Sequence, residues 1–227
     1  MEVKGEARPV GFPQRSGGLS FCVPFAGRGL ALCWVKIQLE WVCMGRIREP
    51  LQVLAIVAVI SRHDGVVSWT KERLAGMGGE VALESRRFEH GETGFYEREM
   101  GAGLYKQFLL FEQWIDQAEL ADWKVLTNRL EEEFAATGKF EEKRPLNLDP
   151  GYLSEAKLVL ATTKDRDHRI YLRDGIYAEV TLHYVKNEWQ GARWTYPDYQ
   201  RADYHAFFSE CRDYFRKRKM LAGNETG

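Results

Sequence analysis

The densest group of side chains that could do chemistry is the run KDRDHR that begins at Lys164. Lys164, Arg166 and Arg169 supply positive charge. His168 can carry a proton near neutral pH, and Glu179 follows on the next predicted strand. Guanidinium and ammonium groups bind phosphate, while neighbouring carboxylates recruit Mg²⁺ or accept a proton. The run therefore predicts a site for a small phosphorylated or nucleotide-like anion, although a solvated loop with a cross-strand pair between Arg169 and Glu179 explains the same residues.

Two shorter segments offer further candidates. NLDPGY at 147–152 has Asn and Asp before Pro-Gly, a combination typical of a tight turn that would project Asp149 as a base or a weak metal ligand. SRHD at 61–64 follows an apolar run, and Arg62 and His63 would lie where strand ends and helix N-termini gather ligands. Turn chemistry alone explains the first segment equally well. Capping of a helix by the serine or the aspartate explains the second.

Several catalytic motifs are missing from the sequence. It contains no GxxxxGK[ST] phosphate loop, no GxGxxG, no HExxH, no CxxC and no GxSxG. TGKF at 137–140 only imitates the end of a phosphate loop, because it lacks the upstream glycine and the hydroxyl after the lysine. These absences disfavour phosphate-loop nucleotide hydrolases, zinc sites and serine hydrolases.

An aromatic stretch near the C-terminus supports a second interpretation. Its members are Trp189, Trp194, Tyr196, Tyr199 and Tyr204. They could dock a protein partner, which would make the chain a non-catalytic interaction domain, or they could seal a domain edge. Stacking on nucleic acid is disfavoured because the whole chain has a formal net charge of −1.

The composition divides the chain into two unlike pieces. Residues 1–43 hold three of the four cysteines, three of the seven prolines and only eight charges. We expect this segment to be a poorly ordered extension, with Met44 as a plausible natural start. Residues 44–220 are expected to form one domain, followed by a disordered tail at 221–227.

The cysteine content and the apolar stretches bear on location. Only Cys211 falls after residue 43, so no disulfide can form within that part of the chain, which favours a reducing cytoplasm. The apolar stretches 19–27 and 29–35 are interrupted by Arg28 and are far shorter than the roughly 20 residues that span a bilayer. We therefore expect no membrane partner; the oligomeric state is not predicted.

The elements that would position these side chains follow from apolar patterning. LQVLAIVAVI at 51–60 predicts a strand buried on both faces, and the polar turn after it leads into a helix that ends at 76–79. Two strands, within 80–88 and 104–114, should be joined by a long loop. A capping box at Asp116 predicts a helix that ends near Gly138.

The order of these elements indicates an α+β fold with a ferredoxin-like or split βαβ sheet, helices packed on it, and an added C-terminal hairpin and helix. Residues 144–148 are a further strand candidate, while 153–162 fit either a strand or a helix that turns into one.

The predicted hairpin has a three-residue loop, 173–175, because that register places Tyr171 opposite Tyr177 and keeps the apolar side chains on one face. Apolar residues at helical spacing over 204–215 predict the terminal helix, and the basic run 216–219 should lie at its C-terminal end.

Five ordered blocks resemble the bacterial DUF4416 family. They are MGRIREP at 44–50, NLDPGYL at 147–153, KDRDHRIYL at 164–172, GIYAEVTL at 175–182 and TYPDY at 195–199. Similar proteins typically begin at the equivalent of Met44, and some carry the name GTP-binding protein. The resemblance implies no catalytic residues. This sequence contains neither the phosphate loop nor the base-recognition motif that a GTP-binding protein would be expected to have.

Overall fold

A computed structural model describes residues 20–24, 34–38, 48–91 and 97–224. The chain divides into two compact units, Met1–Glu49 and Pro50–Gly227. In the first unit, β1 (Ser20–Pro24) and β2 (Trp34–Gln38) form an antiparallel pair. The expectation of weak order at 1–43 falls mostly on residues outside the described ranges.

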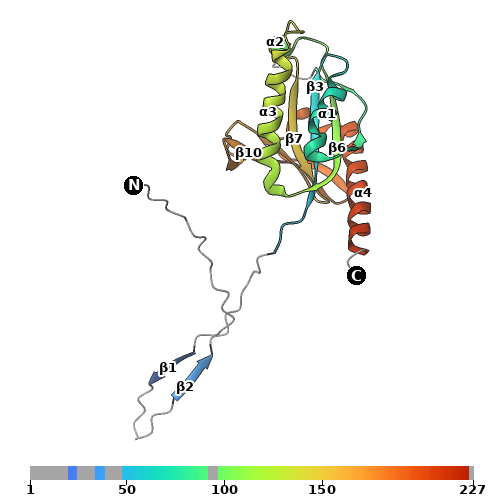
Figure 1. Cartoon of the computed structure of the whole chain (residues 1–227). Helices are drawn as coiled ribbons and strands as arrows, with labels where there is room; N and C mark the ends of the chain where they lie inside the picture. The colour runs from blue at the N-terminus through green and yellow to red at the C-terminus, as the bar shows by residue number, and fades with distance from the viewer. Residues whose placement is uncertain (1–19, 25–33, 39–47, 92–96, 225–227) are drawn as a thin grey trace, which may run out of the picture. The chain divides into compact units, whose positions relative to one another are not determined.

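The second unit is built on an antiparallel sheet of nine strands within the described residues (Figure 1). Seven of them follow the order β11-β10-β8-β7-β3-β6-β4, with β5 paired to β6 and β9 paired to β10. Their bounds are β3 Val53–Ser61, β4 Val81–Glu84, β5 Phe88–Glu89, β6 Tyr105–Ile115, β7 Asn147–Leu153, β8 Lys157–Thr162, β9 Ile170–Arg173, β10 Ile176–Val185 and β11 Glu188–Gly191. The predicted α+β class is confirmed.

Helices cover both faces of this sheet. One face carries α1 (Val66–Gly78) and α3 (Leu120–Ala136), and the other carries α4 (Ala202–Asn224) (Figure 1). Shorter helical segments are α2 Glu97–Met100, η1 Gln117–Glu119 and η2 Pro197–Gln200. In the part of the chain that the structure describes, no helix is long and apolar enough to cross a membrane.

The central strand β3 explains why two helical layers are needed. Its alternate residues point to opposite faces, so Val57 packs in the α1 and α3 layer while Ile56 packs in the α4 layer. Every residue of β3 is buried, as the continuous apolar run predicted.

Of the two helix starts predicted from capping residues, the start of α3 is confirmed and the start of α1 is not. The predicted capping box is present: the Asp116 carboxylate accepts from Ala118 N–H, Glu119 accepts from Asp116 N–H, and η1 leads directly into α3. The predicted capping of α1 by Asp64 is wrong. Gly65 occupies the N-cap position, and Asp64 instead pairs with Arg87 at 2.6 Å.

The tight turn predicted at 147–152 is also wrong, because this segment is strand β7 inside the sheet. It pairs with β3 on one side, where Ala58 lies opposite Asp149, and with β8 on the other. The residues Asn-Leu-Asp-Pro-Gly favour a turn, but the segment forms a strand, since the lack of a side chain at Gly151 lets the backbone of β8 approach closely. A Cβ at Gly151 would overlap the backbone oxygen of Val159.

Gly151→Ala should therefore lower the free energy of unfolding by about 1–3 kcal/mol, because the clash involves backbone that cannot rotate away. Gly76→Ala is the matched control: nothing lies within 4 Å of its added Cβ, and α1 should gain about 0.5–1 kcal/mol. Urea denaturation of both variants measures these changes. Equal stability of Gly151→Ala and the natural protein would contradict the close approach.

Within 153–162, Leu153 ends β7 and Lys157–Thr162 forms strand β8, so the strand alternative is confirmed. The hairpin after β8 differs from the prediction in one detail. The loop contains two residues, Asp174 and Gly175, both with positive φ (55° and 75°), as a tight type I′ turn requires. Arg173 pairs with Ile176, and a bulge then restores the predicted register, with Tyr171 opposite Tyr177. Arg173, which the prediction had placed in the loop, is therefore paired, and Leu172 is the extra residue at the bulge.

The predicted terminal helix is present as α4, with Tyr204, Phe208 and Cys211 fully buried. Burial raises the pKa of the Cys211 thiol well above its ordinary value, so this cysteine serves packing. The helix continues to Asn224, beyond position 220. The basic run 216–219 therefore lies before the last turn instead of at the helix end.

Candidate functional site

A pocket of about 480 Å³ opens at the end of the sheet where β3 and β8 finish and β6 and β7 begin. Six cationic side chains line it, although they come from distant parts of the sequence. They are Lys106, Lys124, Arg144, Lys164, Arg166 and Arg169. Three carboxylates also line the pocket, from Asp149, Glu179 and Asp198.

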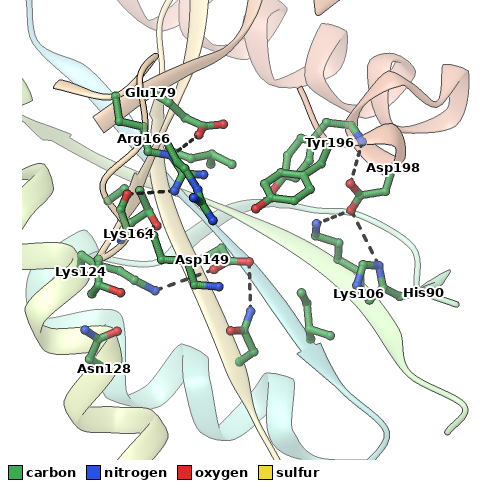
Figure 2. Close-up of a pocket in the computed structure, with 18 of the residues that line it drawn as sticks. His90, Lys106, Lys124, Asn128, Asp149, Lys164, Arg166, Glu179, Tyr196 and Asp198 are labelled. Carbon is green, nitrogen blue, oxygen red and sulfur yellow. Dashed lines mark hydrogen bonds and ion pairs between the residues drawn. The ribbon is translucent and has the colours of Figure 1, made fainter. Parts of the chain in front are cut away.

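Five of the eight sequence-predicted residues line this pocket, and Figure 2 shows several of them turned toward one another. These five are Lys164, Arg166, Arg169, Asp149 and Glu179. The charged loop and β7 are therefore brought together although 15 positions separate Asp149 from Lys164. The antiparallel pairing of β7 with β8 produces this convergence, because the start of β7 lies beside the end of β8.

The predicted pair between Arg169 and Glu179 forms one wall. Arg169 Nε donates to Glu179 Oε2 at 2.7 Å, with both side chains at most 5% exposed. Burial alone would lower the pKa of the Arg169 guanidinium, but Glu179 and the Tyr196 hydroxyl hold that pKa above its ordinary value. This pair is consequently a permanently charged but locally neutral part of the wall.

His168 lies behind this wall and does not line the pocket. Its Nε2 is 3.3 Å from Glu179 Oε2, and its Nδ1 is 3.0 Å from Asp167 Oδ1. The ring stacks on Trp194 at 5.1 Å between centroids. His168 therefore contacts Glu179 of the Arg169–Glu179 pair from the side that faces away from the pocket.

Arg166 differs from the other arginines of the site. Its side chain is exposed, and it makes no hydrogen bond or ion pair with any other residue in the described ranges. Figure 2 shows it reaching into the pocket between Glu179 and Asp149. Its five N–H donors are available to a ligand.

Lys124 supplies a buried charge from α3. Its ammonium donates to Leu148 O at 2.8 Å and lies 3.8 Å from Asp149 Oδ1. Asn147 Nδ2 donates to Asp149 Oδ2 at 3.0 Å. Asp149 is thus oriented from two sides, which fixes where its free lone pairs point.

Arg144 completes this end of the pocket, just before β7. It pairs with Glu131 at 2.9 Å and also donates to Asn147 Oδ1. Burial raises the pKa of Glu131, while Lys124 and Arg144 oppose that rise. Glu131 also accepts from Leu148 N–H at 2.8 Å, so it holds the start of β7 against α3.

A second buried cluster lies at the other end of the pocket and was not predicted. Lys106 Nζ donates to Asp198 Oδ2 at 2.7 Å, and His90 Nδ1 is 3.8 Å from the same oxygen. The ammonium also lies 4.1 Å from the centre of the Tyr199 ring. Asp198 and Tyr199 belong to the TYPDY block at 195–199, but no chemical motif marks Lys106 or His90. The only signal was a lysine within a strongly apolar strand, an unusual place for a charge unless it is paired.

Arg62 and His63 do not join the site. Both pair with Glu142 at 3.1 Å, and the His63 ring lies 4.2 Å from that of Phe140. They lie beyond the end of β3, where the chain turns away from the pocket toward α1. At this end of β3, Ile60 lines the pocket, whereas Arg62 and His63 do not.

The aromatic stretch is divided between the core and the pocket rim. Trp189, Tyr199 and Tyr204 are at most 4% exposed and belong to the core on the α4 side of the sheet, with Tyr204 lying in α4 itself. Trp194 and Tyr196 are 38% and 48% exposed, and Tyr196 lines the pocket. Most of the surface that the interaction hypothesis needed is therefore inside the fold.

No group of three or more His, Cys, Asp or Glu side chains that could hold a metal ion occurs among the described residues. Asp149, the predicted weak Mg²⁺ ligand, offers a single carboxylate, and this carboxylate lies 3.8 Å from the Lys124 ammonium. A ligand that brought its own phosphate oxygens would be needed to complete a magnesium site there.

Fold and site together define an antiparallel α+β protein with a cation-lined pocket at one end of its sheet. The chain belongs to the family described as "Domain of unknown function (DUF4416)", which matches residues 51–215 and confirms the resemblance. Comparison with curated proteins and with solved structures found no match.

Proposed function

We propose that the pocket binds a small phosphorylated or nucleotide-like anion. The observation that carries this proposal is the convergence of six cationic side chains on one pocket of about 480 Å³ that holds three carboxylates. Surface charges normally point apart into water, and buried charges are costly unless they are paired or serve a ligand.

Not all of the cationic side chains that line the pocket are paired with a carboxylate of the protein. Asp198 compensates Lys106, and Glu179 compensates Arg169. The Arg166 side chain has no hydrogen-bond or ion-pair partner among the residues described, so the pocket keeps a guanidinium for an incoming anion. Guanidinium groups bind phosphate with two parallel, charge-assisted hydrogen bonds.

The size of the pocket also fits a small molecule. Ligand sites typically have volumes of roughly 300–1,000 Å³. The lining combines charged groups with the apolar side chains of Ile60, Leu160 and Pro197, as expected for a ligand with both a charged and a less polar part. GTP, the ligand in the name of some related proteins, is one candidate among such anions.

Two finer points of the sequence analysis remain proposals. We propose that β7-β3-β6-β4 with α1 and α3 is a ferredoxin-like split βαβ unit; what supports it is that strand order together with the chain order strand, helix, strand, strand, helix, strand. We also propose a cytoplasmic location, supported by the single cysteine after residue 43, Cys211, being buried.

A thermal-shift panel on the full chain tests ligand binding. Ribose 5-phosphate, GMP and GTP, each with and without Mg²⁺, are compared with the uncharged ribose and guanosine. At least one phosphorylated compound should raise Tm, because a ligand present at 100 times its Kd stabilises the native state by about 2.7 kcal/mol. Shifts that are absent at millimolar concentration, or equal for the uncharged compounds, would reject the proposal.

A further inference from the structure

The two ends of the pocket differ in charge. Lys124, Arg144, Lys164 and Arg166 lie at the end formed by α3, β7 and the loop after β8. Two carboxylates of the lining belong to this end: Glu179, which is paired with Arg169, and Asp149, which lies toward the middle of the pocket (Figure 2). Arg144 is paired with Glu131, so among the described carboxylates of the lining Lys124, Lys164 and Arg166 face Asp149 alone. This end therefore carries an excess of positive charge.

The opposite end is polar but has no excess of positive charge. The Lys106 ammonium is matched by the Asp198 carboxylate at 2.7 Å. Burial, aided by the nearby Lys106, lowers the pKa of His90 below its ordinary value of 6.5, so its imidazole is neutral at pH 7. Figure 2 shows these three side chains gathered together, apart from Lys124 and Asn128.

The carboxylates indicate which groups suit the middle and far end. Asp149 and Asp198 line the pocket as acceptors of hydrogen bonds, and a neutral imidazole can accept or donate one. Hydroxyl groups are the natural partners of such a set, because they donate to carboxylates without adding charge. A second phosphate placed there would find no lining cation, among the described residues, that is not already matched by a carboxylate.

We infer that the ligand is a sugar phosphate, with its phosphate held at the Lys124, Lys164 and Arg166 end and its hydroxyl groups directed toward Asp149, Asp198 and His90. The ribose phosphate part of a nucleoside monophosphate belongs to the same class. This inference rests on the proposed function, since it assigns the ligand class of that same pocket.

Isothermal titration of the full chain tests the inference with three probes: inorganic phosphate, phenyl phosphate and ribose 5-phosphate. Ribose 5-phosphate should bind at least about tenfold more tightly than the other two, because two or more net hydrogen bonds to its hydroxyl groups give a factor of that order. Glucose 6-phosphate and GMP extend the hydroxyl-bearing set, and fructose 1,6-bisphosphate should bind no better than a monophosphate.

Asp149→Asn gives the sharper readout, because its two expected effects have opposite signs. Loss of the negative charge should leave inorganic phosphate binding unchanged or tighter, while the preference for the sugar phosphate falls severalfold. His90→Leu, which removes a polar group at the other end without adding charge, should reduce the same preference.

The outcomes separate the two proposals. If no hydroxyl-bearing phosphate exceeds phenyl phosphate, or if its preference survives both variants, the sugar phosphate inference is wrong while anion binding stands. If none of the phosphates binds, the proposed function fails and the inference fails with it.

Discussion

Arg166→Ala should weaken the binding of a phosphorylated ligand by about 10–100-fold, since a charge-assisted hydrogen bond contributes roughly 1.5–3 kcal/mol. The Tm of the unliganded protein should stay the same, because the Arg166 side chain is exposed and pairs with no residue in the described ranges. Titration calorimetry measures the affinity, and a thermal melt without ligand measures the stability.

Arg193→Ala is the matched control for this prediction. Arg193 is 82% exposed, lies in the same part of the fold, and does not line the pocket. Its replacement should leave the ligand affinity within about twofold, because the interaction of an exposed charge outside the pocket with the ligand is largely screened by salt. Equal losses in both variants would mean that the protein attracts anions through its general surface charge and that the pocket is not the site.

Asp198→Ala should lower the free energy of unfolding by about 3–5 kcal/mol, because it leaves the Lys106 ammonium buried without its carboxylate. Lys106 is 2% exposed, so water cannot readily replace the lost partner. For a domain of this size the loss corresponds to a fall in Tm of roughly 6–20 °C. Urea denaturation of the full chain measures the change directly.

Two further variants distinguish a buried charge from a general packing defect. Asp64→Ala breaks an ion pair whose aspartate is 90% exposed, and it should cost less than about 1 kcal/mol. Adding Lys106→Met to Asp198→Ala should recover part of the lost stability, because it removes the unpaired charge. A double variant less stable than Asp198→Ala alone would contradict this account.

The elements whose residues interact along the chain were predicted well. The capping box at Asp116 involves residues three positions apart, and α3 follows from it. The terminal helix α4 was visible in the spacing of its apolar residues, and β3 in its continuous apolar run. In each case the determining contact is local, or the burial is so complete that composition reveals it.

The errors arose where a distant part of the chain decides the conformation. Asp149-Pro150-Gly151 has the residues of a turn, yet β3 and β8 hold it between them as a strand. The N-cap of α1 is Gly65, and Asp64 pairs with Arg87 of another segment instead of capping the helix. Local preferences of about 1 kcal/mol are easily outweighed by the burial of a whole strand.

The candidate site shows the same division. The charged loop that contains Lys164 and Arg166 was recognisable as a group, since its members are neighbours in sequence. Lys106 and Lys124 each stand alone within an apolar strand or an amphipathic helix, and a single charge in such a place usually points to solvent. Only the folded chain shows that they face the same pocket.

The sequence by itself determined the α+β class, the buried central strand, the register of the β9–β10 hairpin beyond its bulge, and one charged segment of the pocket. The tertiary structure decided that β7 lies between β3 and β8, and that His90, Lys106 and Asp198 meet although up to 108 positions separate them. The physical reason is that strand order and buried pairing depend on contacts between distant segments. Periodicity and spacing report only on neighbours along the chain.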